Sequence, residues 1–425
     1  MNTFDFIRLF RAVLSPRAVL DTQVIERMGL LAVKIAQMYA VRPDLVGIEK
    51  SLQLSRLLQR AAPLEPEEFD QRWAELAPGA LRADLAELNR EPLAAASLGQ
   101  AHRARLRDGR ELVVKILKRD IRDKFVRDVE QLRRWLRLGL LVYPRLERLA
   151  DPLGTLETVA HQTLTEMNFL AEQAGASRLA TLASQESWRL EHLQRLNFPK
   201  HFAEYSHERL LVSEFVPGRT LAEWLEQGGL PYEVLLELFR IHGYFLFVRG
   251  EFHGDLHPGN VIWRDGHFWF LDNANIETIP PAFARGLFDM LVLLGEGDTT
   301  RAAQRLADLS ITPLPAARFR RFQSDFVALY DGFAQKPIRE VSLTQQMMKT
   351  VKLAVTSGIN FPRGAFPLVK SLMYLDGMVL RAAPQATLLR DVGQFADDFG
   401  PPTTLEATCQ SACTGANGPT AFELR

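Results

Sequence analysis

The sequence predicts an α+β protein that divides into lobes or domains. Three observations lead to this prediction. Residues 91–117 carry a hairpin pattern, in which two strands flank an Arg-Asp-Gly turn. Helical periodicity fills most of the chain before and after this hairpin. At 425 residues, the chain is long enough to bury a large core and to divide into lobes.

The remaining elements follow from periodicity. Residues 1–90 are expected to be helical throughout, and the apolar stretch 22–60 should be buried on most sides. Residues 118–185 return to helical periodicity. A strand, a turn at Pro217-Gly218 and a helix are expected in ERLLVSEFVPGRTLAEWL. Further helices are expected over 231–249 and 280–395, and the aperiodic tail from Gly400 is expected to be disordered.

The composition excludes several classes of protein. Lys+Arg and Asp+Glu are both 51, so no global field attracts nucleic acid, although local patches remain open. Cys409 and Cys413 provide no disulfide framework, and no nearby histidine completes a zinc site. A reducing, cytoplasmic compartment is the default interpretation.

No apolar run is long enough for a transmembrane helix, and the best one, LFDMLVLLG, carries an acid. The N-terminus is interrupted by charges and is not a secretory signal. It does place an apolar stripe on one helical face, formed by Phe6, Ile7, Phe10, Val13 and Leu14. Such a helix either packs on its own domain or lies on an anionic membrane surface, which would make the protein peripherally associated.

The segment HGDLHPGN, residues 253–260, carries the chemistry. Asp255 is placed to orient an attacking hydroxyl or take its proton, and Asn260 to bind Mg²⁺ through its amide oxygen. Asp272 follows the strand HFWFL, and a tight hairpin at residues 264–266 should return it beside Asn260. Asp272 would then bridge the metal and nucleotide phosphates. The alternative is that all three residues only cap turns, but their spacing favours phosphoryl transfer.

A phosphate-transfer site also needs a lysine on a strand. Lys115 alternates out of the apolar strand LVVKILK, where it is costly unless paired, or it is a strand-end lysine that reaches solvent. The segment AAASLGQ lies upstream, where a phosphate-covering loop belongs. Its residues Ala94, Ala95 and Ala96 would hinder close backbone approach to phosphates.

Two families share HGDLHPGN. One is the aminoglycoside and choline kinase type, and the other is the UbiB (AarF) family of atypical protein-kinase-like proteins. The chain resembles the second family in order and spacing over residues 25–395. The resemblance lies in VKIAQMYAVRPDL (a K-x-G-Q-like motif), PLAAASLGQAHRA, EMNFLAEQA, LLVSEFVPGRTL and FPLVKSLMYLDGMVLRAAP.

The resemblance implies a bilobal protein-kinase-like fold and an order of domains. These are a helical extension over residues 1–90 that covers the active site, an N-lobe with inserted helices over 91–216, a helical C-lobe over 217–398, and a tail over 399–425.

The resemblance also implies roles for individual residues. Lys115 would contact the phosphates of ATP or ADP and pair with Glu172. Lys34 and Gln37 would fold over the site, with Glu166 holding Lys34. The nucleotide-binding set would further include Ala94, Ala95, Ala96, Ser97, Glu214 and Val216. Asp255 would be catalytic, and Asn260 and Asp272 would bind Mg²⁺.

Three departures from the family pattern matter. Ala36 replaces the glycine of K-x-G-Q and adds a methyl group where the helix should pack closely. Asn168 replaces an aspartate, which removes one negative charge facing Lys34. The triplet Asp-Asn-Ala at 272–274 replaces Asp-Phe-Gly, so the loop should be stiffer.

These features leave three functions to compare. The first is a UbiB-like ATPase or atypical kinase that supports isoprenoid-quinone biosynthesis at or near the membrane. Its expected partners are nucleotide, anionic lipid and quinone-biosynthesis proteins, but not nucleic acid. The second is a small-molecule kinase of the aminoglycoside type, which needs an open acceptor pocket. The third is a nucleotide-binding pseudokinase scaffold. The physiological substrate and the oligomeric state stay open.

Overall fold

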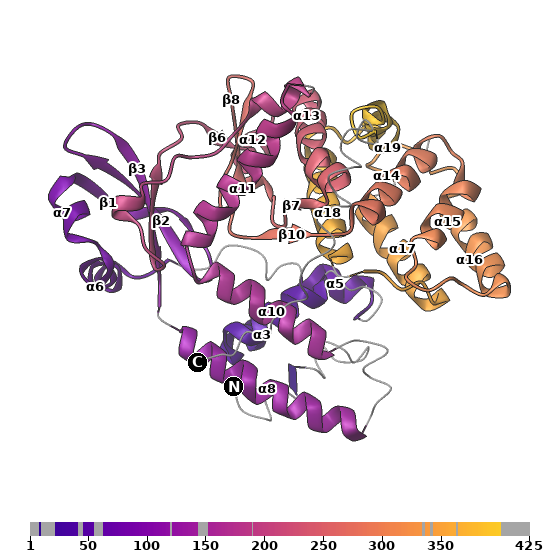
Figure 1. Cartoon of the computed structure of the whole chain (residues 1–425), viewed down its shortest axis with the longest axis horizontal. Helices are drawn as coiled ribbons and strands as arrows, with labels where there is room; N and C mark the ends of the chain where they lie inside the picture. The colour runs from indigo at the N-terminus through magenta and orange to yellow at the C-terminus, as the bar shows by residue number, and fades with distance from the viewer. Residues whose placement is uncertain are drawn as a thin grey trace, which may run out of the picture.

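A computed structural model describes residues 8–9, 22–40, 46–54, 63–119, 121–142, 152–188, 190–333, 336–340, 343–362 and 364–400. A strand-rich lobe and a helical lobe lie at opposite ends of the molecule, and a layer of helices lies below them in the view of Figure 1. The predicted N-terminal stripe, residues 41–45 and both cysteines lie outside the described residues.

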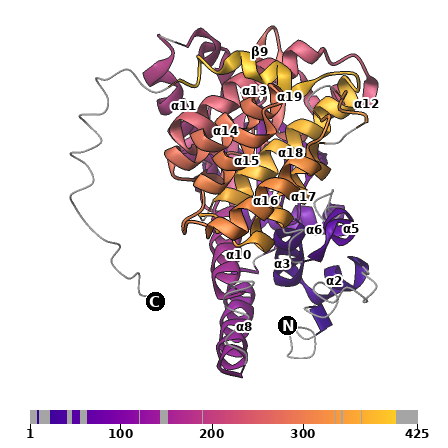
Figure 2. The same ribbon diagram turned by 90° about the vertical axis from the view of Figure 1, so that its right-hand side faces the viewer.

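The helical layer combines two parts of the chain that are distant in sequence. The N-terminal helices α2 (Thr22–Met28), α3 (Leu30–Ala40) and α5 (Ile48–Leu54) meet the inserted helices α8 (Arg122–Val142) and α10 (Pro152–Glu166). Ile35 and Tyr39 of α3 share one buried cluster with Leu132 of α8 and Val159 of α10. The same cluster includes Leu117 and Leu211 of the strand-rich lobe, so the helical layer packs against that lobe. The helix α8 projects from the layer in both views (Figures 1 and 2).

The small lobe is an antiparallel sheet in the order β1-β2-β3-β5. Its strands are β1 (Leu85–Ala95), β2 (Gly99–Leu106), β3 (Glu111–Leu117) and β5 (Leu210–Glu214), and α6 (Pro66–Leu76) and α7 (Gly79–Asp84) accompany them. Phe69 of α6 packs with Val114 and Ile116, which alternate along β3. The predicted turn between β2 and β3 is confirmed, with Gly109 at φ 91°.

The prediction of helix up to residue 90 is wrong, because β1 begins at Leu85. Leu85 and Leu88 are spaced like residues on a helical face. Both nevertheless lie on a strand and pack against the buried cluster that contains Phe69 of α6. β1 lies at the edge of the sheet and shifts register around Pro92, which cannot donate a hydrogen bond. Its largely exposed residues do not alternate in burial, so the sequence carries no strand signal there.

The centre of the molecule holds α11 (Leu170–Glu186) and two small sheets. One sheet has the order β4-β9-β8-β6, and β7 (Glu251–His253) pairs with β10 (Ile276–Thr278) in the other. The bounds of the first are β4 (Leu196–Asn197), β6 (Arg219–Thr220), β8 (Val261–Arg264) and β9 (His267–Phe270). The segment HGDLHPGN spans the passage from β7 to β8, between the two sheets.

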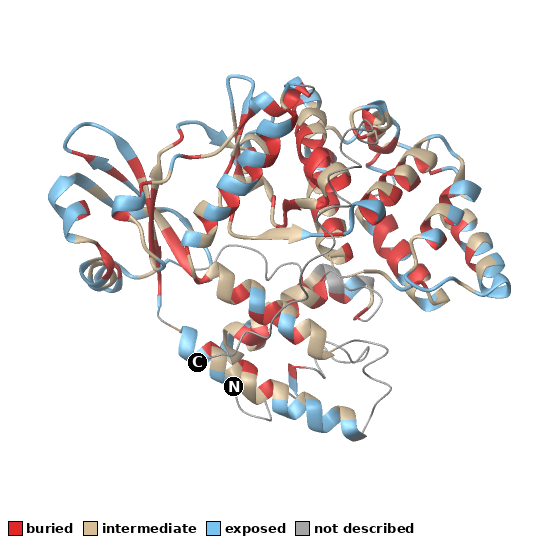
Figure 3. Ribbon diagram, viewed as in Figure 1, coloured by how far each residue is buried: buried red, intermediate tan, exposed pale blue. Residues whose placement is uncertain are grey.

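Helices build the larger lobe, as predicted. These are α12 (Leu221–Gln227), α13 (Tyr232–Gly243) with its π-helical continuation η4 (Tyr244–Arg249), α14 (Pro281–Gly295), α15 (Thr299–Asp308), α16 (Ala316–Leu329), α17 (Leu343–Ser357), α18 (Ala365–Ala382) and α19 (Leu388–Val392). Figure 3 shows buried residues along the facing sides of these helices.

Phe399, which the sequence assigned to the tail, is buried in the core of this lobe. Its ring lies 4.9 Å from that of Phe288, and a side chain at Gly243 would collide with it. The lobe therefore extends to this residue. Within the described residues, no helix is long and apolar enough to span a bilayer.

Candidate active site

The β8–β9 hairpin returns the chain to Asn260, as predicted. Asp265 (φ 51°) and Gly266 (φ 76°) both adopt left-handed backbone conformations, which the tight turn requires. The Leu271 amide donates to the Asn260 carbonyl at 2.8 Å, so Asp272 follows immediately beside it. Asp272 itself has a positive φ of 50°, an uncommon conformation for a residue with a side chain.

Lys115 brings the two lobes together. It lies on β3 between the buried residues Val114 and Ile116, and its side chain emerges on the opposite face. Its Nζ lies 2.6 Å from Glu172 Oε2 and 2.9 Å from Asp272 Oδ2. Although burial lowers the pKa of Lys115, the carboxylates of Asp272 and Glu172 raise it above its usual range. The lysine is paired, and it does not reach solvent as a lone strand-end residue would.

Glu172 and Asp272 share this one ammonium group, which leaves an excess negative charge. Burial raises the pKa of Glu172, and Asp272 adds to the rise, while Lys115 opposes it. A divalent cation beside Asp272 would relieve this excess. Asn260 fits the role of a second ligand for this cation. Its amide NH₂ donates to the Asp255 carbonyl at 3.1 Å, so its amide oxygen points away from that carbonyl.

A complete metal site is not preformed in the described part of the chain, where no group of three His, Cys, Asp or Glu side chains could hold a metal ion. This agrees with Mg²⁺ chemistry, since that ion usually takes one or two protein oxygens together with substrate phosphates. The residues present therefore fit a magnesium ion that arrives with a nucleotide.

A buried histidine shapes the loop around Asp255. The Asp255 amide donates to His253 Nδ1 at 3.1 Å, so the proton lies on Nε2, which faces the Leu271 carbonyl at 3.2 Å. Burial lowers the pKa of His253, so the ring is neutral. One imidazole thus joins the strand before Asp255 to the strand before Asp272 and fixes their spacing.

Two residues from α18 complete this loop, and sequence reasoning missed both. Lys370 Nζ lies 2.6 Å from Asp255 Oδ1, and the Tyr374 hydroxyl donates to the same oxygen at 3.0 Å. Despite burial, Lys370 and His257 hold the pKa of Asp255 well below its usual range. A signal was available, because a lysine within the apolar run FPLVKSLMYL needs a partner, as Lys34 does.

The helix α3 reaches the same region. Lys34 Nζ forms an ion pair and hydrogen bond with Glu166 at the end of α10, the partner that was expected. Gln37 lies one turn further along and is half-buried, and Ala36 is fully buried. Asn168, which stands where the family has an aspartate, makes a local contact. Its Oδ1 accepts a hydrogen bond from the Leu170 amide at 3.1 Å, in the turn that precedes α11.

The Asp-Asn-Ala triplet packs closely against α11. Asn273 is buried, and its side chain donates to the Phe270 carbonyl at 2.9 Å. A Cβ atom at Gly175 would lie 1.9 Å from the Asn273 carbonyl oxygen, so only glycine lets α11 approach this closely. Gly175 is thus a further residue that positions this loop and that the sequence did not reveal.

The predicted nucleotide-binding residues that act through backbone occupy two further places. Ala94 and Ala95 end β1, and Ala96 and Ser97 form the turn to β2, where Ala96 N donates to Gly99 O at 2.8 Å. Glu214 ends β5 and Val216 follows it, buried. None of the described contacts joins these residues to the Lys115 cluster, so their roles stay predictions.

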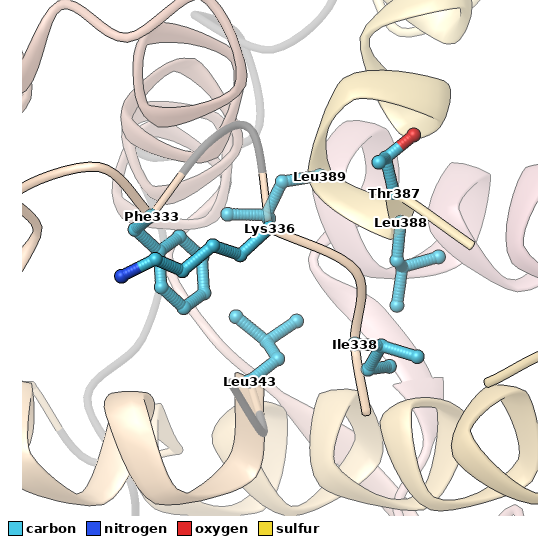
Figure 4. A pocket seen from close by; sticks show the side chains of 7 residues that line it. All are labelled: Phe333, Lys336, Ile338, Leu343, Thr387, Leu388 and Leu389. Atoms are coloured by element: carbon cyan, nitrogen blue, oxygen red, sulfur yellow. The ribbon is translucent and has the colours of Figure 1, made fainter. Parts of the chain in front are cut away.

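One small pocket lies elsewhere, between α19 and the segment before α17. It is lined by Phe333, Lys336, Ile338, Leu343, Thr387, Leu388 and Leu389 (Figure 4). Its lining is mostly apolar and contains none of the candidate site residues.

The bilobal α+β arrangement, with a strand lysine paired to a helix glutamate, is that of kinase-like proteins. Residues 56–306, more than half of the chain, match the family described as the ABC1 atypical kinase-like domain. The chain belongs to this family, and the predicted UbiB resemblance is confirmed.

Individual relatives agree with this assignment. The protein named probable protein kinase UbiB in Vibrio parahaemolyticus is 26% identical over 88% of this chain and 69% of its own length. An uncharacterised Synechocystis protein is 26% identical over 84% of this chain and 88% of its own. Rv3197 of Mycobacterium tuberculosis, solved with erythromycin, matches 94% of this chain and 95% of its own with a TM-score of 0.53 and 18% identity, which shows a shared fold.

Proposed function

We propose that this chain binds MgATP and turns it over as a UbiB-like ATPase or atypical kinase that supports isoprenoid-quinone biosynthesis at or near the membrane. The observation that supports this most strongly is the joint contact of Lys115 with Glu172 and Asp272. Three elements distant in sequence converge there, and turn capping alone would not require them to meet.

Each residue has a role in this scheme. Lys115 binds nucleotide phosphates and is oriented by Glu172. Asp272 and Asn260 hold the magnesium ion, which would neutralise charge on the phosphates when bound. Asp255 orients the attacking oxygen. Because its carboxylate already accepts two hydrogen bonds, it is a weak base and acts mainly by positioning.

The Lys34–Glu166 pair supports ATP hydrolysis over transfer to a large acceptor. Glu166 is the last residue of α10. Gln162 of the same helix donates a hydrogen bond to Glu277 of β10, the strand that pairs with β7 just before the loop of Asp255. Burial lowers the pKa of Lys370, but the charge of Asp255 raises it above its usual range. The charge of Glu166 adds a smaller increase. The extension is thus bonded close to Asp255, where a protein acceptor would have to approach.

A pseudokinase that binds nucleotide without turnover is the second candidate. The buried Asn273, with an amide oxygen that meets no donor among the described residues, favours it, because this loop differs from the Asp-Phe-Gly pattern.

Phosphate release from purified protein with MgATP separates these functions. Hydrolysis without any acceptor, lost in Asp255→Asn, is the expected result. Turnover that requires an added small hydroxyl compound would instead identify a small-molecule kinase. Nucleotide binding without turnover would identify the pseudokinase, and no binding at all would refute the proposal.

A further inference from the structure

In the scheme above, Lys370 and Tyr374 only donate hydrogen bonds to Asp255 and have no contact with the nucleotide. We propose that Lys370 is a further active-site residue, which contacts the terminal phosphate of the bound nucleotide, while Tyr374 fixes the Asp255 carboxylate. This inference rests on the proposed function, because it names a phosphate-binding group for the same site.

The first argument is the one-sided hold on Asp255. Lys370 (2.6 Å) and Tyr374 (3.0 Å) both donate to Oδ1, and they stand one turn apart on α18. Among the residues that the structure describes, none donates to Oδ2. The Asp255 side chain is 36% exposed, so a ligand can approach it. A lysine that served only to neutralise a buried carboxylate would not require this arrangement.

The second argument is the unused capacity of the ammonium group. A lysine has three N–H donors, and Asp255 occupies one of them. Nζ also lies beside Tyr374, 5.4 Å from the centroid of its ring, and interacts with its hydroxyl group. The Lys370 side chain is 22% exposed. Even with a second donor turned to Tyr374, one donor can reach an oxygen atom of a ligand that lies against Asp255.

The third argument is position. Asp255 and Asp272 are held near each other, because His253 hydrogen-bonds both the Asp255 amide and the carbonyl of the residue before Asp272. Lys115 already contacts two carboxylates at the Asp272 end of the site. Lys370 stands at the Asp255 end, where an acceptor oxygen meets the terminal phosphate. A cation there stabilises the charge that spreads over that phosphate during transfer, and it reduces repulsion between phosphate and Asp255.

Affinity for two nucleotides distinguishes this role from a purely structural one. Calorimetry would compare a non-hydrolysable ATP analogue with ADP, both with Mg²⁺, on the full chain. The variants are Lys370→Met, Lys370→Arg and Tyr374→Phe, with Lys352→Met as a matched control at an exposed position of α17. Only the analogue carries the terminal phosphate, so a contact with that group affects the analogue alone.

We expect Lys370→Met to weaken binding of the analogue about tenfold, the size of one lost charge-assisted hydrogen bond, and to leave ADP within about twofold. Lys370→Arg should restore most of the difference, and Tyr374→Phe should leave both affinities nearly unchanged. If Lys370→Met does not fold, Lys370→Gln takes its place in the same comparison.

Equal weakening of both nucleotides, or of neither, would overturn the assignment of Lys370 while leaving the proposed function intact. If the wild-type protein binds neither nucleotide, the proposed function is wrong and this inference fails with it.

Discussion

Three lysines in largely apolar elements each meet a carboxylate from a distant part of the chain. Lys34 meets Glu166, Lys115 meets Glu172 and Asp272, and Lys370 meets Asp255. A buried ammonium without a partner costs several kcal/mol, so each pair constrains how the elements can be arranged. The charges that serve the proposed chemistry therefore also hold the lobes and the extension in place.

We expect Asp272→Asn to abolish magnesium-dependent nucleotide binding, because this carboxylate is the proposed link between metal and phosphates. At about 100 times Kd, a ligand stabilises a protein by about 2.7 kcal/mol, which gives a clear rise in melting temperature. The variant should lose the rise produced by MgATP. Asp265→Asn is the matched control, since that residue lies in the exposed hairpin turn and also has a positive φ. An unchanged rise in Asp272→Asn would place the metal elsewhere.

Gly175→Ala should destabilise the protein by about 1–3 kcal/mol, the usual cost of overpacking, because the new methyl group would overlap the Asn273 carbonyl. Gly377→Ala on α18 is the matched control. No atom lies within 4 Å of its added Cβ, and we expect it to stabilise the helix by about 0.5–1 kcal/mol. Urea denaturation would measure both. A neutral effect of Gly175→Ala would show that α11 and the Asp272 loop can separate easily.

At the scale of elements, α10 connects the extension to the catalytic loop. Its last residue, Glu166, bonds Lys34 of α3, and Gln162 bonds Glu277 of β10. Its apolar face shares a buried cluster with α3 and α8. Movement of the extension away from the site would have to disrupt this helix or its polar contacts.

Glu166→Gln should loosen α3. Because Glu166 is one-third exposed, we expect a cost of about 1–2 kcal/mol, below the roughly 3–5 kcal/mol for a fully buried pair. Hydrogen exchange across residues 30–40 should become faster than in Glu208→Gln, a control at an exposed glutamate. Equal protection of α3 in the variant and the wild type would mean that Lys34 depends on another partner.

Much of the site was predictable because it depends on short-range patterns. The β3 alternation identified Lys115, and the turn at 264–266 identified the return of Asp272 to Asn260. Three features were not predictable for physical reasons. β1 is an exposed edge strand without alternation. The sequence indicates that Lys370 needs a partner, but not that this partner lies 115 residues earlier in the chain. Gly175 is required only by an approach of backbone across elements.

At the scale of the whole molecule, the proposed membrane association would occur at the surface, through an amphipathic N-terminal helix. We expect the protein to float with anionic liposomes through the apolar stripe within residues 6–14, which lies outside the described residues. Deletion of residues 2–15 should reduce flotation, and deletion of the last 14 residues should not. If the shortened protein floats equally well, another surface carries the contact. The exposed Trp135, Leu138 and Leu141 of α8 would then be the next to test.

The central claim is that a kinase-like site in this chain holds magnesium and nucleotide between its lobes. A crystal structure with Mg²⁺ and a non-hydrolysable ATP analogue tests it most directly. The account predicts phosphates at Lys115, a metal ion bound by Asn260 and Asp272, adenine against the backbone of residues 214–216, and α3 still bonded to Glu166. A nucleotide bound elsewhere, or a metal ion that Asp272 does not contact, would contradict the account.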